Sequence, residues 1–251
     1  MEGLDHKNII IFGATGFIGQ SLTNILANTG ARLIIHGKTY EKVNELYQST
    51  SSKNDNIISF CSDVLSEKFY LELFKTVSSH FDHIDVMINL IGKFNGLKSI
   101  TDLSHRDWND LMEINFSCYW RIIKELNSIM GGKKKTKIIF LTNKKIEKGK
   151  AYHHALGLSK SCLYSLVNTL NDEKKKIGLE TKLIETEQLN IGITGLLRGQ
   201  NFFKKKDLDT IIKKIMENYN YFIRILFLLN FHTSHRLGVF RRNIDGIKHQ
   251  L

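Results

Sequence analysis

The feature that most constrains the fold lies near the amino end, where an apolar run, a glycine-rich turn and a helical pattern follow one another. The apolar run is Asn8–Phe12, and the turn reads Gly13-Ala14-Thr15-Gly16-Phe17-Ile18-Gly19. Glycines let a backbone approach a pyrophosphate closely, and the free N–H groups of a helix start favour its negative charge. The position between a first strand and a first helix makes the triplet informative, although an ordinary tight turn is the alternative. The residues assigned to this phosphate cradle are Gly13, Thr15, Gly16, Phe17, Ile18 and Gly19.

Apolar runs alternate with helical stretches along most of the chain. This alternation is typical of βαβ units and predicts an α/β, Rossmann-type, doubly wound and mostly parallel sheet with helices on both faces. Strands are expected at Asn8–Phe12, Arg32–His36, Ile57–Cys61, Val86–Leu90, Lys137–Leu141 and Thr181–Ile184. Helices are expected at Ile18–Asn28, Tyr40–Gln48, Glu67–Ser79, Asp107–Met130 and from Gly157 to about Lys176, with a polar loop at Ser49–Asp55.

The length of the chain suits one large domain. With 251 residues, 42% of them hydrophobic, the chain can bury a sizeable core. No internal repeat or linker divides it, so residues 1–251 are expected to form a single dinucleotide-binding domain. The pattern weakens after Ile191, and residues 196–251 are expected to form its substrate side.

The net charge and the cysteines of the chain indicate which partners it can bind and in which compartment it is expected. A net charge of +11 permits a phosphorylated cofactor or an acyl carrier, but the lysine runs lack interleaved aromatic residues, so nucleic acid is not expected as a partner. Three dispersed cysteines without a CxxC motif indicate a reducing compartment and no metal site. A strand pattern starts too early for a signal peptide, and the longest apolar stretch is shorter than the ~20 residues of a membrane span. A cytoplasmic protein is expected.

Further motifs follow the phosphate cradle in sequence order: Asp63-Val64 after the third expected strand, Asn89 and Gly92 at the end of the fourth, Asn115 in the next helix and Thr194 after the sixth strand. Together they resemble the short-chain dehydrogenase/reductase superfamily, most clearly over residues 8–196. The chain departs from the family where Phe17 replaces the middle glycine of the turn. It departs again at Leu189-Asn190, which stand where the family has Pro-Gly; the chain contains no proline. The resemblance implies a sheet of about seven strands. It also implies cofactor contacts from Asp63, Val64, Asn89, Gly92, Lys160 and Thr194.

The end of the second strand indicates which nucleotide is preferred. NAD-binding sites of this fold usually place an acid there, whereas this chain has His36-Gly37-Lys38-Thr39. A lysine suits the additional 2′-phosphate of NADP, so NADP(H) is expected over NAD(H). The alternative is that Lys38 is an ordinary surface lysine.

The catalytic positions match the family only in part. The resemblance implies a tyrosine, a lysine four residues later, a serine and an asparagine, the lysine lowering the pKa of the phenol. Lys160 matches the lysine and Asn115 the asparagine, but Leu156 stands in place of the tyrosine and Asn143 in place of the serine. Leucine carries no ionisable proton. The usual reductase mechanism is therefore not expected to run.

A neighbouring side chain could deliver the proton instead. Tyr152, His153 and His154 lie close to where some enoyl reductases of the superfamily place their tyrosine, and an imidazolium is an acid near neutral pH. A displacement of one residue turns a helical side chain by about 100°, which disfavours Tyr152. The alternative is that these are solvated loop residues. The candidate catalytic residues are thus Lys160, Asn115, Asn143, Tyr152 and His153.

Two functions are favoured by the sequence, ahead of a third, a basic Rossmann domain that associates with nucleic acid. The first is an NADP(H)-dependent oxidoreductase with a non-standard or degenerate active site, acting on a small-molecule carbonyl, enoyl or acyl-thioester substrate. The second is a catalytically inactive NADP(H)-binding or regulatory protein. The long helices Asp107–Met130 and Gly157–Lys176 are the usual association faces of the family, which implies a homodimer or homotetramer.

Overall fold

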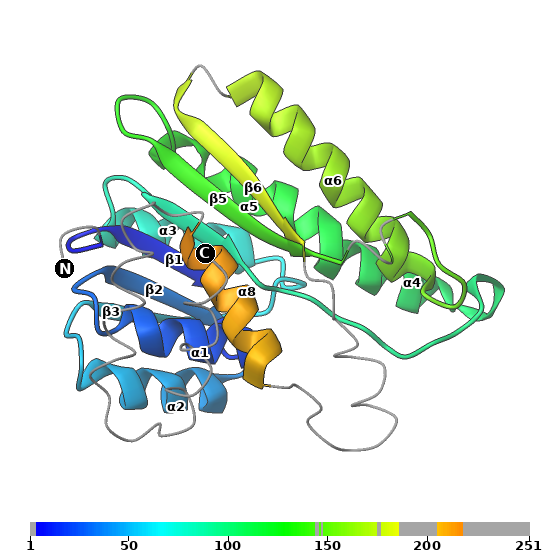
Figure 1. Cartoon of the computed structure of the whole chain (residues 1–251), viewed down its shortest axis with the longest axis horizontal. Coiled ribbons are helices and arrows are strands. Elements are labelled where there is room, and N and C mark those ends of the chain that lie inside the picture. Colours follow the sequence, from blue (N-terminus) through cyan, green and yellow to red (C-terminus); the bar gives the residue numbers. More distant parts are fainter. Residues whose placement is uncertain (1–3, 144–145, 147, 175–176, 186–204, 218–251) are drawn as a thin grey trace, which may run out of the picture.

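A six-stranded parallel sheet, with strand order β3-β2-β1-β4-β5-β6, forms the centre of the protein (Figure 1). The computed structural model describes residues 4–143, 146, 148–174, 177–185 and 205–217. The strands are β1 Asn8–Phe12, β2 Arg32–Gly37, β3 Ile57–Cys61, β4 Val86–Asn89, β5 Thr136–Thr142 and β6 Leu179–Glu185. The predicted fold class is confirmed. Within these ranges the sheet has six strands, where the family resemblance implied about seven.

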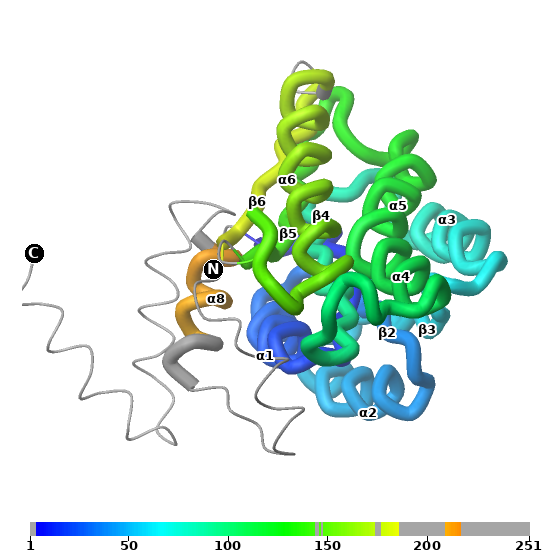
Figure 2. The backbone as a smooth tube through the Cα atoms, turned by 90° about the vertical axis from the view of Figure 1, so that its right-hand side faces the viewer, coloured from blue at the N-terminus to red at the C-terminus, as the bar shows by residue number. Residues whose placement is uncertain are grey.

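Helices cover both faces of the sheet (Figures 1 and 2). Those on one face are α1 Phe17–Leu26, α2 Tyr40–Ser51 and α8 Lys205–Glu217. Those on the other are α3 Phe69–His80, α4 His105–Met112, α5 Cys118–Leu126 and α6 His154–Lys174. Short turns of helix also occur at η1 Ile100–Asp102, η2 Glu113–Ser117 and η3 Asn127–Ile129.

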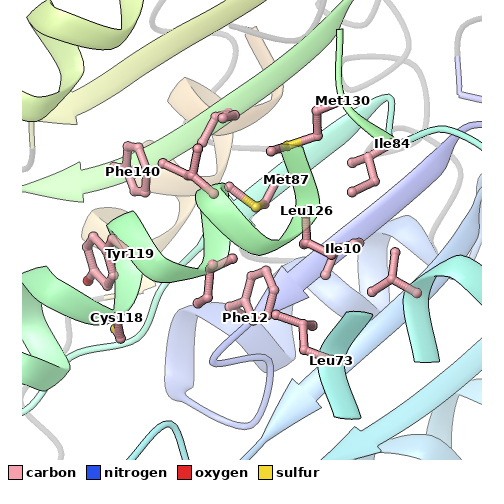
Figure 3. Packing of buried hydrophobic residues seen from close by; sticks show 14 of the residues in the cluster. Ile10, Phe12, Leu73, Ile84, Met87, Cys118, Tyr119, Leu126, Met130 and Phe140 are labelled. Atoms are coloured by element: carbon pink, nitrogen blue, oxygen red, sulfur yellow. The ribbon is translucent and has the colours of Figure 1, made fainter. Parts of the chain in front are cut away.

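Alternation along the central strand divides the core into two layers. Ile10 and Phe12 of β1 point toward α3 and α5 (Figure 3), and they belong to one buried cluster with Leu73 and Tyr119. Ile9 and Ile11, and the apolar residues of α1, α2 and α8, form the second layer. Because successive side chains of a strand face opposite sides, a strand buried on both faces reads as an unbroken apolar run.

The predicted helix Asp107–Met130 is wrong as a single element. Helix α4 begins earlier, at His105, and a π-helical turn at Glu113–Ser117 separates it from α5. The Asn115 side chain lies within this turn and donates to the carbonyls of Lys93 and Leu111. Single π turns inside helices occur frequently at functional sites.

Two other boundaries differ from the prediction. Helix α2 continues to Ser51, into the predicted polar loop, and Thr50 in its last turn is buried and donates its hydroxyl to the Leu46 carbonyl. Helix α6 starts at His154 rather than at Gly157. Both differences lie at the ends of helices, where polar residues are compatible with either helix or loop.

Helix α8 was not predicted. Its residues Ile211, Ile212, Ile215 and Met216 are buried in the same layer as α1, and Figure 2 shows the two helices side by side. At least this part of residues 196–251 therefore belongs to the core. None of the helices in the described ranges is long and apolar enough to cross a membrane.

Candidate functional site

Two adjoining cavities open where the carboxyl ends of β1 and β4 meet the glycine turn. The inner cavity has a volume of about 490 Å³ and reaches toward α5, β5 and α6. The outer cavity, of about 660 Å³, reaches toward the ends of β2 and β3. Both are lined by Gly13, Gly16, Leu90, Ile91, Gly92 and Lys93. The strand order reverses between β1 and β4, which is where open α/β sheets bind their ligands.

The glycine turn fits a pyrophosphate closely. Gly13 has a φ of +74°, and a Cβ there would lie 2.9 Å from the Leu90 carbonyl carbon. A Cβ at Gly19 would lie 2.3 Å from the Gly13 carbonyl oxygen, so glycine is required for helix α1 to approach the turn. Gly16 caps α1 without a side-chain hydrogen bond, and Phe17 borders the inner cavity with 45% of its surface exposed. An uncapped helix start against a close-packed glycine turn suits an anion.

Lys38 and Asp63 form an ion pair at the edge of the outer cavity. The Lys38 ammonium lies 2.7 Å from a carboxylate oxygen of Asp63, whose other oxygen accepts from the Leu65 backbone N–H. Partial burial opposes ionisation of Asp63, but these hydrogen bonds outweigh it and keep the pKa of its carboxyl below the usual value. A Cβ at Gly37 would lie 2.6 Å from the Thr15 side chain, so an acid does not fit there without rearrangement.

His36 also lines the outer cavity, a role that the sequence analysis did not assign. Its ring is almost fully buried, with centroids 5.4–5.5 Å from those of Phe12, Phe60 and Phe69, and it hydrogen-bonds the Ser62 carbonyl. Burial lowers the pKa of His36 to about 4. The imidazole is therefore neutral at physiological pH.

Asn115 holds the loop that follows β4. Its side-chain oxygen accepts from the Lys93 N–H, and its nitrogen donates to the Lys93 and Leu111 carbonyls. Both ends of the amide are thus occupied by backbone. Asn115 lines the inner cavity, as does Gly92 beside it, and its hydrogen bonds fix the cavity wall.

Lys160 lies at the inner cavity above an aromatic ring. Its Nζ donates to the Leu141 carbonyl at 3.5 Å and lies 5.9 Å from the centroid of Tyr119. Tyr119 in turn stacks on Phe140 and donates its hydroxyl to the Ile91 carbonyl. Burial lowers the pKa of Lys160 to about 8. Sequence reasoning missed Tyr119, although its place one helical turn after Asn115 could have identified it.

Leu156 and His153 line the inner cavity together with Lys160, and so does Asn143. His153 is 5% exposed, so the interpretation of it as a solvated loop residue is wrong. Its Nδ1–H donates to the Ala151 carbonyl at 3.0 Å, and this is the one side-chain hydrogen bond that His153 makes to the described residues. His153 lines the inner cavity, and its Nε2 is the ring nitrogen that no described residue engages.

The two neighbours of His153 do not reach either cavity. Tyr152 is 62% exposed and has a positive φ. His154 is buried, stacks on Phe94 and hydrogen-bonds the Gly96 carbonyl at 2.8 Å. The structure thus brings together Lys160, Asn115, Asn143 and His153 but not Tyr152. The predicted cofactor contact Thr194 lies outside the described residues.

Comparisons with known proteins agree with this architecture. The sequence model of the family described as short chain dehydrogenase matches residues 7–196. An uncharacterized oxidoreductase of Staphylococcus epidermidis is 22% identical over 209 residues, which cover 83% of this chain and 88% of the relative.

Solved structures show the same fold. One is that of a putative short chain dehydrogenase from Pseudomonas syringae (TM-score 0.74, 20% identity, 83% of this chain and 87% of that chain). Another is that of a putative short chain dehydrogenase from Shigella flexneri complexed with NADP (TM-score 0.68, 19% identity, 74% and 80%).

Proposed function

Because the chain belongs to the short chain dehydrogenase family, we propose that it is an NADP(H)-dependent oxidoreductase acting on a carbonyl or enoyl group bound in the inner cavity. One observation supports this most directly: the glycine turn, the loop held by Asn115 and the side chain of Lys160 all border one cavity. Such a cavity can hold the pyrophosphate at one end and a reacting carbon at the other.

The chain's own residues account for the binding of the nucleotide. Gly13, Gly16 and Gly19 would hold the pyrophosphate, Lys38 the 2′-phosphate and Lys160 the ribose beside the nicotinamide. When bound, NADPH supplies a hydride. The preference for NADP(H) is supported by Lys38 and by the lack of space for an acid at Gly37. The NADP complex of the Shigella flexneri protein is consistent with it.

The proton must come from a residue other than Leu156. His153 is the candidate that the geometry favours, because it lines the same cavity as Lys160 and its hydrogen bond to a described residue engages Nδ1 rather than Nε2. A protonated imidazole donates at Nε2 to a substrate oxygen or carbon, while the Ala151 carbonyl holds the ring through Nδ1. Asn143 can donate to the substrate carbonyl oxygen.

A matched pair of histidine variants tests the proposal. His153→Gln should lower NADPH-dependent turnover of carbonyl or enoyl substrates about 100-fold or more, with an unchanged Kd for NADPH, because a general acid contributes 10²–10⁴-fold. His154→Gln is the control, since His154 does not line the inner cavity and should leave turnover within a fewfold. Equal turnover in wild type and His153→Gln would remove His153 from the mechanism.

A catalytically inactive NADP(H)-binding protein is the second candidate. Leu156 favours it, and so does Asn115, whose amide is fully engaged by backbone. Calorimetric binding of NADPH without turnover over a broad panel of carbonyl, enoyl and acyl-thioester substrates would support it over an enzyme. The cytoplasmic location and a homo-oligomer formed through α4, α5 and α6 stay predictions.

A further inference from the structure

Lys160 differs from the other lysines around the two cavities. Lys38 and Lys93 pair with Asp63 and Asp110 at 2.7 and 3.3 Å. No carboxylate of the described residues pairs with Lys160, and its one hydrogen bond, to the Leu141 carbonyl, is 3.5 Å long. An ammonium carries three donors, so at least two of them have no acceptor among the residues that the structure describes.

The surroundings of this amine are mostly apolar. Leu141, Ile146 and Leu156 line the inner cavity beside it, and the face of Tyr119 lies below it. Burying an ammonium without a partner is costly, which favours the neutral amine. With a pKa of about 8, about a quarter of Lys160 is neutral at pH 7.5, against roughly 0.1% of an ordinary lysine.

We propose that Lys160 is a carbonyl-capturing amine, which forms an imine with a small apolar aldehyde that enters the inner cavity of the nucleotide-free protein. The neutral Nζ adds to the aldehyde carbon to form a carbinolamine. The C–O bond then breaks, and water leaves with the carbonyl oxygen and the two amine hydrogens. No oxidant or reductant is consumed. His153, whose Nε2 borders the same cavity, can carry the protons.

Imine formation also suits the cavity energetically. It converts a side chain that is charged for most of the time into a neutral C=N group, so the cost of holding an ammonium among leucine and isoleucine side chains disappears. A cavity of about 490 Å³ has room for an aldehyde of the size of benzaldehyde. This activity does not require that the protein oxidises or reduces a substrate.

Reductive trapping tests the proposal on the full-length protein. Nucleotide-free protein is mixed with benzaldehyde at pH 7.5, and cyanoborohydride then delivers a hydride to the imine carbon and leaves a stable secondary amine. Peptide mass mapping should locate the benzyl group at Lys160, formed at least about tenfold faster than on any exposed lysine. Lys160→Arg keeps the charge but should abolish this adduct. Lys93→Arg is the matched control, because Lys93 lines the same cavity in an ion pair, and should leave the Lys160 adduct unchanged.

The proposal would be overturned if the benzyl groups were spread over the exposed lysines with no preference for Lys160. Because the wild-type map identifies the modified residue by itself, the proposal stays falsifiable if Lys160→Arg does not fold. A separate measurement adds NADPH before the aldehyde. Under the proposed function the nucleotide covers Lys160 and suppresses the adduct. If NADPH does not suppress the adduct, the proposed nucleotide site is contradicted, whereas the proposal that Lys160 forms an imine still stands.

Discussion

Replacing Gly19 by alanine should destabilise the protein because of the close approach of α1 to the glycine turn. The added Cβ would lie 2.3 Å from the Gly13 carbonyl oxygen and 2.6 Å from two backbone atoms of Ala14. An ordinary contact is about 3.4 Å, so helix and turn must separate by about 1 Å (3.4 − 2.3). The atoms that clash belong to the backbone and cannot turn aside as a side chain can.

The expected cost follows from overpacking. Forced shifts of this kind typically cost 1–3 kcal/mol, and here the shift also loosens Leu22 and Leu26, which are buried in the core layer behind α1. We expect a loss of about 2 kcal/mol in the free energy of unfolding. For a domain of this size that corresponds to a fall in Tm of roughly 4–8 °C.

Thermal melting of nucleotide-free protein and urea unfolding measure this loss. Gly16→Ala is the control, because a Cβ at Gly16 meets only the Gly13 carbonyl oxygen at 3.3 Å and the backbone there, with φ −74° and ψ 167°, suits alanine. Its Tm should stay within about 2 °C of wild type. If the Tm of Gly19→Ala equals that of wild type and of Gly16→Ala, the close packing of helix α1 against the glycine turn is refuted.

Two further predictions concern the outer cavity. Burial lowers the pKa of His36 to about 4 in the folded protein, against 6.5 for an ordinary histidine. As the pH falls, the unfolded chain therefore takes up a proton before the folded protein does. The free energy of unfolding should decrease by about 3 kcal/mol between pH 6.5 and pH 4. His36→Phe should lose this part of the pH dependence in urea unfolding; an unchanged slope would contradict a neutral buried imidazole. Lys38→Ala should raise the Kd for NADPH roughly tenfold and leave the Kd for NADH unchanged, measured by titration calorimetry. Equal weakening of both nucleotides would show that Lys38 does not contact the 2′-phosphate.

The strands and the phosphate cradle were predictable from the sequence because their signals are local. The run Asn8–Phe12 is apolar throughout, as a strand buried on both faces must be. The glycines that follow it mark a place where backbone packs against backbone, with a Cβ at Gly19 lying 2.3 Å from the Gly13 carbonyl oxygen. Open α/β sheets bind their ligands at the carboxyl ends of the strands, so the edge of the sheet at which the cavities open could also be anticipated, whereas the order of the strands was not predicted.

The remaining details depend on contacts between distant parts of the chain. The π turn around Asn115 is tied to the backbone of Lys93, 22 residues earlier, and no pattern within Asp107–Met130 reports that hydrogen bond. His153 is buried because residues 152 and 154 adopt positive φ and because Phe94, far away in sequence, stacks on its ring. Neither feature leaves a periodicity that a sequence analysis could detect.

The pairing of β1 with β4 has a consequence for the stability of the whole molecule. It joins two halves of the sheet, β3-β2-β1 and β4-β5-β6, and both cavities border that junction. A dinucleotide that spans the cavities would contact both halves of the sheet and so stabilise the junction between β1 and β4. Mass action sets the size of the effect: at a ligand concentration 100 times its Kd, unfolding costs about 2.7 kcal/mol more. Occupancy by nucleotide would then govern how long the protein survives heat and proteases, whether or not a reaction follows.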